Sequence, residues 1–141
     1  MREIKFRGKR VDNGEWVYGY YVQTPIFESR IYWKPFIEST SNTYHQVISE
    51  SVGQFTGFKL KNDVEIYDGY ILGDWTDVDG KMVQSRVPVF FDELTGQWML
   101  DMSSMKDRSY SVSLFSDLQE YDYELLGNIY ENPDLLSSLP L

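Results

Sequence analysis

Short runs in which apolar and polar residues alternate recur along the chain, and turns that contain glycine separate them. Near the start, "REIKFRGK" alternates charged and apolar side chains, and "EWVYGYYV" follows after the turn residues Asn13 and Gly14. Alternation with a period of two is typical of strands, and Asn-Gly is a preferred hairpin turn. The pattern predicts a β-hairpin with its basic side chains on one face and Trp16, Tyr18 and Tyr20 on the other.

The same pattern continues in the second half of the chain. "VEIYDGYIL" is a strand candidate that follows a turn at residues 61–63. "WTDVDGKMVQ" predicts a hairpin that turns at Asp79 and Gly80, and "VPVFFDELTGQWML" predicts another that turns near Thr95 and Gly96. Both hairpins resume their alternation directly after the turn.

Two short helical pieces are indicated near the C-terminus. "SLFSDLQEY" suits a helical turn with Ser113 or Ser116 as its N-cap. Asn132 and Pro133 suit the start of a second short helix over about 132–138. Between these pieces, "YELLGNIYE" is a further strand candidate.

Together these elements predict a mainly β fold in a single domain that spans residues 1–141. We divide this domain into an N-terminal β part over about 1–63, a barrel-like β part over about 64–130 and the short C-terminal helix. The closely spaced strands and tight turns of the second part favour an SH3-like small barrel.

Composition excludes several classes of protein. The chain has no cysteine, which excludes disulfides, thiolate nucleophiles and Cys-ligated zinc and suits a cytosolic protein. No apolar run approaches the ~20 residues of a membrane helix, and the segment after Met1 lacks the apolar core of a signal peptide. We therefore expect a cytoplasmic protein that does not associate with a membrane.

The net charge of −9 is unevenly distributed along the chain. Residues 1–61 carry nine Lys or Arg and six Asp or Glu, whereas residues 62–141 carry four and sixteen. Such a distribution influences solubility and the encounter with partners rather than the fold. The overall acidity argues against a general nucleic-acid coat protein.

Three segments together resemble the YopX family of phage and prophage proteins. They are "REIKFRGKR", "VGQFTGFKLKNDVEIYDG" and "YELLGNIYENPDLL", and they occur in the family's order over almost the whole chain. The resemblance implies a mainly β fold and a protein of a phage or integrated element in a bacterial cell. It implies no activity, cofactor or catalytic residue, because the function of the family is uncharacterised.

The central one of these segments departs from the family pattern in its turn. Asn62 and Asp63 stand where relatives have Asn-Gly, so one of these two residues must take any positive φ. We expect the segment to be architectural, with Gly53, Gly57 and Gly69 at tight or positive-φ positions.

No motif for catalysis, nucleotide binding or metal binding is complete. Asp74, Asp77 and Asp79 precede Gly80, but a calcium loop with this glycine in sixth position would begin at a residue without a carboxylate. His45 is the only histidine, and the glycine motifs that bind phosphates are absent. We therefore assign no catalytic, cofactor-binding or metal-binding residue, and an enzyme is the third hypothesis for the function.

A basic group in the first predicted hairpin is a candidate for nucleic-acid binding. It consists of Lys5, Arg7, Lys9 and Arg10, beside a strand rich in aromatic residues. Basic side chains contact phosphates and aromatic rings stack on bases, so single-stranded nucleic acid is a conceivable ligand. The alternative is an ordinary solvated strand face.

An acidic group near the C-terminus is a candidate for binding a protein. It has no basic residue among its members, which are Asp117, Glu120, Asp122, Glu124, Glu131 and Asp134. Such an acidic surface is complementary in charge to the basic surface of a DNA-binding protein. It would bind that basic surface in place of DNA. The alternative is a solvated acidic face.

The leading hypothesis is a non-enzymatic accessory protein that binds a host or phage protein and needs no cofactor. A nucleic-acid-binding module that uses the basic hairpin is the alternative. Homo-oligomers are also expected, because the many aromatic side chains exceed what one small core can bury.

Overall fold

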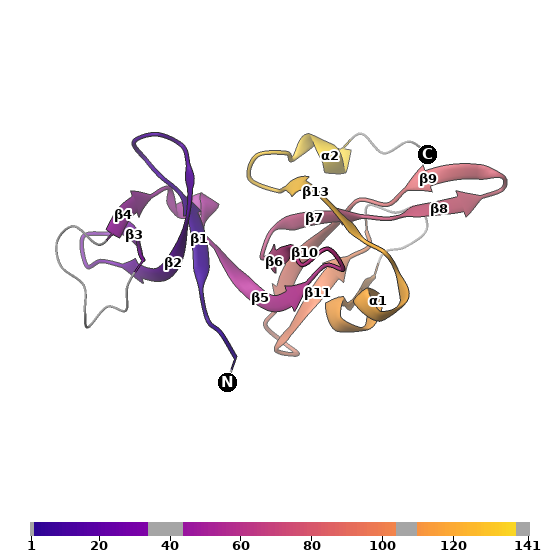
Figure 1. Cartoon of the computed structure of the whole chain (residues 1–141), viewed down its shortest axis with the longest axis horizontal. Coiled ribbons are helices and arrows are strands. Elements are labelled where there is room, and N and C mark those ends of the chain that lie inside the picture. Colours follow the sequence, from indigo (N-terminus) through magenta and orange to yellow (C-terminus); the bar gives the residue numbers. More distant parts are fainter. Residues whose placement is uncertain (1, 34–43, 104–109, 138–141) are drawn as a thin grey trace. The chain divides into compact units, whose positions relative to one another are not determined.

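A computed structural model describes residues 2–33, 44–103 and 110–137 of the chain. The chain folds as two compact units, residues 1–57 and residues 58–141 (Figure 1). Strands dominate both units, which confirms the predicted mainly β class. No helix among the described residues has the length and apolar character to cross a membrane.

The N-terminal unit is built from antiparallel strands joined by short turns. Its elements are β1 (Phe6–Lys9), β2 (Trp16–Gln23), β3 (Ser29–Tyr32), β4 (Tyr44–Val47), the 3-10 turn η2 (Ser49–Ser51) and the first part of β5 (Gly53–Lys59). They form a sheet in the order β4-β3-β2-β1-β5, so β2 is the central strand. The boundary between the two units falls inside β5.

The sheet of the N-terminal unit curls until the end of β1 reaches the end of β4, where Arg10 bridges to Val47. Its inner face packs Ile31 and Val47, which are almost completely buried. Gly8 fits there because a Cβ atom would lie 3.0 Å from the Val47 side chain. Residues that alternate with these form what we call the outer face: Arg7, Lys9, Trp16, Tyr18, Tyr20, Val22, Arg30, Tyr32, Tyr44 and Gln46.

The C-terminal unit combines a five-stranded antiparallel sheet with a separate hairpin and short helices. Its elements are β6 (Glu65–Tyr67), β7 (Tyr70–Gly73), β8 (Trp75–Val78), β9 (Lys81–Gln84), β10 (Val87–Asp92), β11 (Gln97–Asp101), β12 (Ser111–Ser113), α1 (Leu114–Glu120), β13 (Glu124–Asn128) and α2 (Asp134–Ser137). The larger sheet has the order β12-β11-β10-β7-β13. Its core consists of fully buried apolar side chains, among them Ile71, Leu72, Val87, Leu100 and Leu114.

Strands β8 and β9 form a two-stranded sheet of their own. Figure 1 shows this hairpin extending away from the rest of the C-terminal unit. Asp79 has a φ of 53° and Gly80 a φ of 81°, as a type I′ hairpin turn requires. The predicted hairpin with its turn at these two residues is therefore confirmed.

Other local predictions in this unit are also confirmed. The Ser113 hydroxyl accepts a hydrogen bond from the Ser116 amide over 3.3 Å and caps α1. Asp63 takes the positive φ in its turn, at 66°, and Gly96 closes the turn between β10 and β11 with a φ of 68°. Helix α2 lies within the segment predicted as the C-terminal helix.

The described strands do not form a closed barrel. β6 belongs to the same sheet as β5, and β8 and β9 pair only with each other, so these strands do not extend the five-stranded sheet towards closure. The SH3-like small barrel predicted for residues 64–130 is therefore not confirmed.

Candidate functional site

The segment "VGQFTGFKLKNDVEIYDG", the central one of the three that resemble the family, mainly supports the fold. Gly57 has a φ of 89° and Gly69 a φ of 84°, a region that favours glycine, whereas Gly53 is buried in β5 without such a φ. A Cβ atom at Gly69 would lie 3.2 Å from the Ile129 side chain. Ile66 is completely buried. These residues support the fold and present no reactive group.

The last segment of the resemblance closes a turn through a network of side chains. Asn128 is 8% exposed, and its Nδ2 donates to Glu131 Oε1 over 3.1 Å while its Oδ1 accepts from the Glu131 amide over 2.8 Å. Asn132 Oδ1 accepts from the Asn128 amide over 3.1 Å. A Cβ atom at Gly127 would lie 2.4 Å from that same oxygen. Folding alone explains this run of residues.

Within the three described ranges, no group of three or more His, Cys, Asp or Glu side chains is placed to hold a metal ion. His45 instead packs against Trp33, with 4.7 Å between their ring centroids. Burial lowers the pKa of His45, and the nearby Arg10 guanidinium lowers it further. His45 is therefore a neutral, packed side chain at neutral pH.

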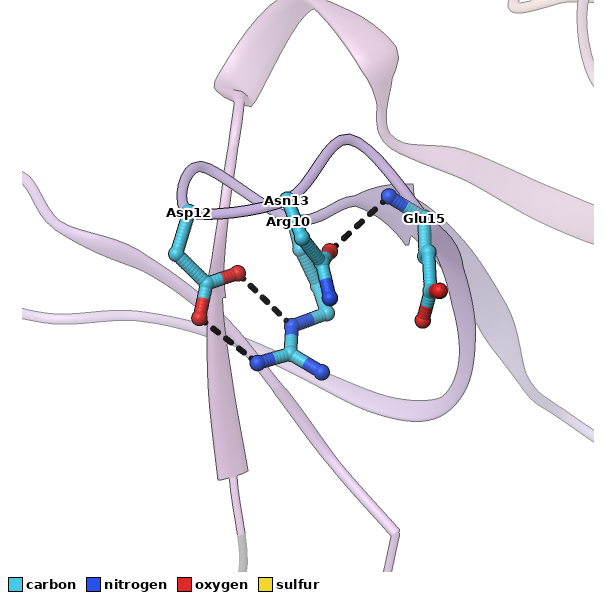
Figure 2. A network of polar contacts seen from close by, with 4 residues as sticks. All are labelled: Arg10, Asp12, Asn13 and Glu15. Carbon is cyan, nitrogen blue, oxygen red and sulfur yellow. Dashed lines mark hydrogen bonds and ion pairs between the residues drawn. The ribbon is translucent and has the colours of Figure 1, made fainter.

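Arg10, one of the predicted nucleic-acid contacts, is held in the first hairpin turn. Its Nε and Nη2 donate to the two carboxylate oxygens of Asp12 over 2.8 and 2.6 Å (Figure 2). In the same turn, Asn13 Oδ1 accepts a hydrogen bond from the Glu15 amide over 3.0 Å. The hydrogen bonds from Arg10 lower the pKa of Asp12. The charge of Arg10 is thus offset within the turn.

Arg7 and Lys9 lie on the outer face together with aromatic rings. Arg7 is opposite Tyr18 and Lys9 is opposite Trp16 in the register of β1 and β2. The Arg7 guanidinium lies 3.7 Å from the centroid of the Trp16 ring. The sequence predicted these aromatic residues on one face of the hairpin and the basic residues on the other, and this prediction is wrong. The register aligns odd-numbered positions of β1 with even-numbered positions of β2, so both groups share one face.

The cations of this hairpin differ in how far they reach the surface. Arg7 is only 6% exposed, so it supports the ring above it rather than facing water. Lys9 is half-buried. Lys5 forms an ion pair with Glu3 over 3.3 Å, and its Nζ lies 5.1 Å from the centroid of the Phe55 ring. The four predicted cations therefore do not form one uniform exposed patch.

Asp117, the first of the predicted partner-binding acids, has a structural contact. Tyr123 is buried, and its hydroxyl donates to Asp117 Oδ2 over 2.7 Å. Burial raises the pKa of Tyr123, and the hydrogen bond to Asp117 raises it further. This carboxylate therefore helps to join α1 to the segment that leads into β13.

The predicted acids between the end of α1 and the start of β13 lie at the surface. Asp122 forms an ion pair with Lys61, and both side chains are exposed. Glu120 at the end of α1 and Glu124 at the start of β13 are exposed as well. Glu124 is the register partner of Gly73, which ends β7 shortly before β8 begins. Glu124 therefore lies beside the root of the β8–β9 hairpin.

The hairpin itself carries exposed apolar side chains that were not predicted from the sequence. Trp75, Val78 and Met82 are 53%, 51% and 57% exposed. Asp77 lies opposite Met82 and shares a face with Trp75. The segment "WTDVDGKM" already indicated this exposure. Trp75 and Val78 fall on opposite faces of one strand, and a hairpin that packs on one side can bury only one of them.

Comparisons with known proteins identify a family and a similar fold. The sequence profile of the family described as YopX protein matches residues 5–137, which confirms the resemblance drawn from the three segments. The crystal structure of protein EF1440 from Enterococcus faecalis is similar, with a TM-score of 0.53 and 21% sequence identity over 96% of this chain and 99% of that chain. At this identity the likeness shows the fold alone. No curated protein matches the chain.

Proposed function

Since the chain belongs to the YopX protein family, we propose that it is a phage or prophage accessory protein that binds another protein and catalyses no reaction. It acts in the cytoplasm of the bacterial host. Its partner binds the β8–β9 hairpin and the acid at the hairpin root. The hairpin surface is the name we give to the Trp75 face of the hairpin together with the acid at its root: Trp75, Asp77, Met82 and Glu124.

The exposure of this hairpin supports a binding role most directly. A two-stranded hairpin is only marginally stable in water unless it packs against something. Val83 is the buried residue of its two strands, and every residue of β8 is exposed. A tryptophan gains a large apolar contact when a partner covers it, and tryptophans often dominate the energy of interfaces. A partner that buries Trp75 and Met82 would therefore stabilise the hairpin and gain affinity.

The charge around the hairpin defines the chemistry of the partner. The C-terminal unit carries sixteen Asp or Glu and six Lys or Arg. Asp77 beside Trp75 suits an arginine, whose guanidinium stacks on the indole and pairs with the carboxylate. Glu124 at the root of the hairpin adds negative charge. The partner is thus a host or phage protein with a basic surface that also offers apolar contacts.

A pull-down from bacterial host lysate, with and without nuclease and read by mass spectrometry, tests this function. The double substitution Trp75→Ser/Met82→Ser removes the apolar contacts and should abolish enrichment of the partner. Leu94→Ser is the matched control, because Leu94 is 97% exposed in the turn between β10 and β11 and lies outside the hairpin surface. Circular dichroism should show the same fold for both variants and the unmodified chain.

The charged part of the surface has its own test. Glu124→Lys should weaken the captured complex and reduce its salt dependence, because the substitution reverses one favourable charge. Equal capture by Trp75→Ser/Met82→Ser and by the unmodified chain would exclude the hairpin surface. Enrichment that disappears with nuclease would exclude a direct protein partner.

A further inference from the structure

The outer face of the N-terminal unit has a different chemistry from the hairpin surface. Its register brings together the cations Arg7, Lys9 and Arg30. No strand position of the outer face carries a carboxylate in the residues that the structure describes, although Glu28 reaches Arg30 from the preceding turn. The face is therefore cationic in a chain whose net charge is −9.

Two exposed tyrosines stand at the centre of this face. Tyr18 and Tyr20 are 48% and 43% exposed, whereas the neighbouring Tyr32 is 5% exposed. Alternate residues of a strand point the same way at a spacing of roughly 7 Å, so the two rings form a short row on the central strand β2. Exposed aromatic rings in the middle of a sheet face, rather than at its rim, indicate a surface that contacts a ligand.

Cation–π contacts hold the rings around these tyrosines. The Arg7 guanidinium lies 3.7 Å from the centroid of the Trp16 ring, and the Arg30 guanidinium lies 4.3 Å from that of Tyr44. A cation–π contact orders both side chains, and the ion pair with Glu28 orders Arg30 further. The aromatic surface is therefore preorganised on rigid strands, which lowers the entropy lost when a ligand binds.

A ligand for this face must supply negative charge together with flat groups that stack on tyrosine rings. Single-stranded nucleic acid supplies both, because its phosphates contact Lys and Arg and its unpaired bases stack on aromatic side chains. A duplex keeps its bases inside, and an acidic peptide offers charge without a regular series of flat groups. We propose that the outer face binds single-stranded nucleic acid, with bases on Tyr18 and Tyr20 and phosphates at Lys9 and Arg30.

This site lies in the N-terminal unit and shares no residue with the hairpin surface. It therefore gives the chain a second binding activity besides the proposed protein partner. It also changes the set of cations expected from the sequence. Arg7 acts by holding Trp16. Arg10 donates through Nε and Nη2 to both carboxylate oxygens of Asp12, whereas Arg30 contacts Glu28 through Nε. Arg30 therefore enters from β3 as a new contact, which a phosphate shares with Glu28. The tyrosines supply the stacking surface.

Fluorescence anisotropy with a labelled oligothymidine of about 12 nucleotides tests the site on the full chain. Tyr18→Ala/Tyr20→Ala should weaken binding by on the order of tenfold or more, because both stacking rings are lost. Tyr18→Phe/Tyr20→Phe should bind like the unmodified chain, since stacking needs the ring and not the hydroxyl. Tyr110→Ala is the matched control, because it removes a 52% exposed tyrosine from the C-terminal unit.

An abasic strand and a salt titration separate stacking from charge. An abasic strand of equal length keeps the phosphates but lacks the bases, so it should bind on the order of tenfold more weakly or worse. The logarithm of the affinity should fall with the logarithm of the salt concentration, and Lys9→Gln should reduce this slope by about 0.7. An oligouridine of the same length shows whether RNA and DNA differ.

Three results would overturn the proposal. They are the absence of binding at about 50 mM salt, equal binding of the abasic strand, and unchanged affinity of the folded Tyr18→Ala/Tyr20→Ala variant. If that variant fails to fold by circular dichroism, the abasic strand decides the question on the unmodified chain. Tight binding of a polyglutamate peptide that depends on the same tyrosines would assign the outer face to an acidic protein instead.

Discussion

The two units are built from similar strands and tight turns, yet they differ strongly in charge. Residues 1–57 carry seven Lys or Arg and six Asp or Glu, whereas residues 58–141 carry six and sixteen. In the first unit, cations lie against aromatic rings on one sheet face. In the second unit, carboxylates accompany an exposed apolar hairpin. One small chain can therefore present two surfaces of opposite charge, each suited to a different partner.

The largest expected effect is a loss of stability from one glycine substitution in each unit. A Cβ atom would lie 2.1 Å from the Tyr32 carbonyl oxygen at Gly19 and 2.5 Å from the Ser85 carbonyl oxygen at Gly73. Because backbone atoms cannot easily move aside, Gly19→Ala and Gly73→Ala should each lower the free energy of unfolding of their own unit by about 3 kcal/mol. Hydrogen-exchange mass spectrometry resolves the two units.

Gly96→Ala is the control for these substitutions. Its Cβ atom would meet nothing within 4 Å, so the substitution adds only the backbone strain of a φ of 68° and should cost about 1 kcal/mol. If Gly19→Ala or Gly73→Ala increased exchange equally in both units, the units would unfold as one body. The two units would then share one free energy of unfolding.

A smaller effect is expected from Tyr123→Phe in the acidic unit. The substitution removes the hydrogen bond to Asp117 and should lower the free energy of unfolding by about 1 kcal/mol at neutral pH. The pKa of Tyr123 is raised in the folded state, so its stabilising contribution is present below the ordinary tyrosine pKa of about 10 and is lost as the pH rises further. Urea denaturation between neutral and alkaline pH measures this.

The unmodified chain should therefore lose its advantage over Tyr123→Phe at alkaline pH. Tyr121→Phe is the control, because Tyr121 is 42% exposed and should change stability little. A constant difference between Tyr123→Phe and the unmodified chain from neutral to alkaline pH would contradict the role of the buried hydroxyl.

Salt should distinguish the two units by a few tenths of a kcal/mol. Added sodium chloride screens repulsion among the carboxylates of residues 58–141, because the Debye length is about 10 Å at 0.1 M. We expect hydrogen exchange in this unit to slow as salt rises, and exchange in residues 1–57, whose charges nearly balance, to change less. Equal responses would show that the unequal charge does not govern local stability.

The smallest effect is expected from Asp68→Asn. Burial raises the pKa of Asp68, so its ionised form is disfavoured in the folded state at neutral pH. Because its pKa is raised on folding, Asp68 contributes stability that is fully present below its unfolded-state pKa and is lost as the pH rises through the folded-state value. Asp68→Asn should therefore be slightly more stable than the unmodified chain at pH 7, an advantage that disappears below the ordinary Asp pKa of about 3.9.

Thermal unfolding at both pH values measures this difference, with Asp63→Asn as an exposed control in a nearby turn. A loss of stability in Asp68→Asn at pH 7 would mean that the backbone hydrogen bond from Gly69 to the carboxylate outweighs its burial.

Much of the local structure could be predicted because its causes lie within a few residues. Asp79 and Gly80 adopt the positive φ angles of a hairpin turn, which only a few residue types adopt without strain. Ser113 caps α1 through a hydrogen bond to a residue three positions ahead. Such features do not depend on the rest of the fold, so the sequence alone indicates them.

The candidate surfaces were harder to predict, because they depend on which faces of different strands coincide. Alternation showed that Arg7 and Lys9 share a face within β1, but not which face of β2 lies beside them. The register answered this by placing them against Tyr18 and Trp16. Arg30 could not be assigned to the same surface until β3 was known to pair with β2.

The sequence by itself determined the strand and turn pattern, the caps and the family, because short-range preferences and the characteristic glycines are written in the chain. The tertiary structure decided the alignment of the strands, the burial of Arg7 and the exposure of Trp75 and Met82. These depend on contacts between residues far apart in sequence, where a shift of one position moves a side chain from one face of a sheet to the other. For that reason the same basic and aromatic residues predicted a hairpin correctly but predicted its surface wrongly.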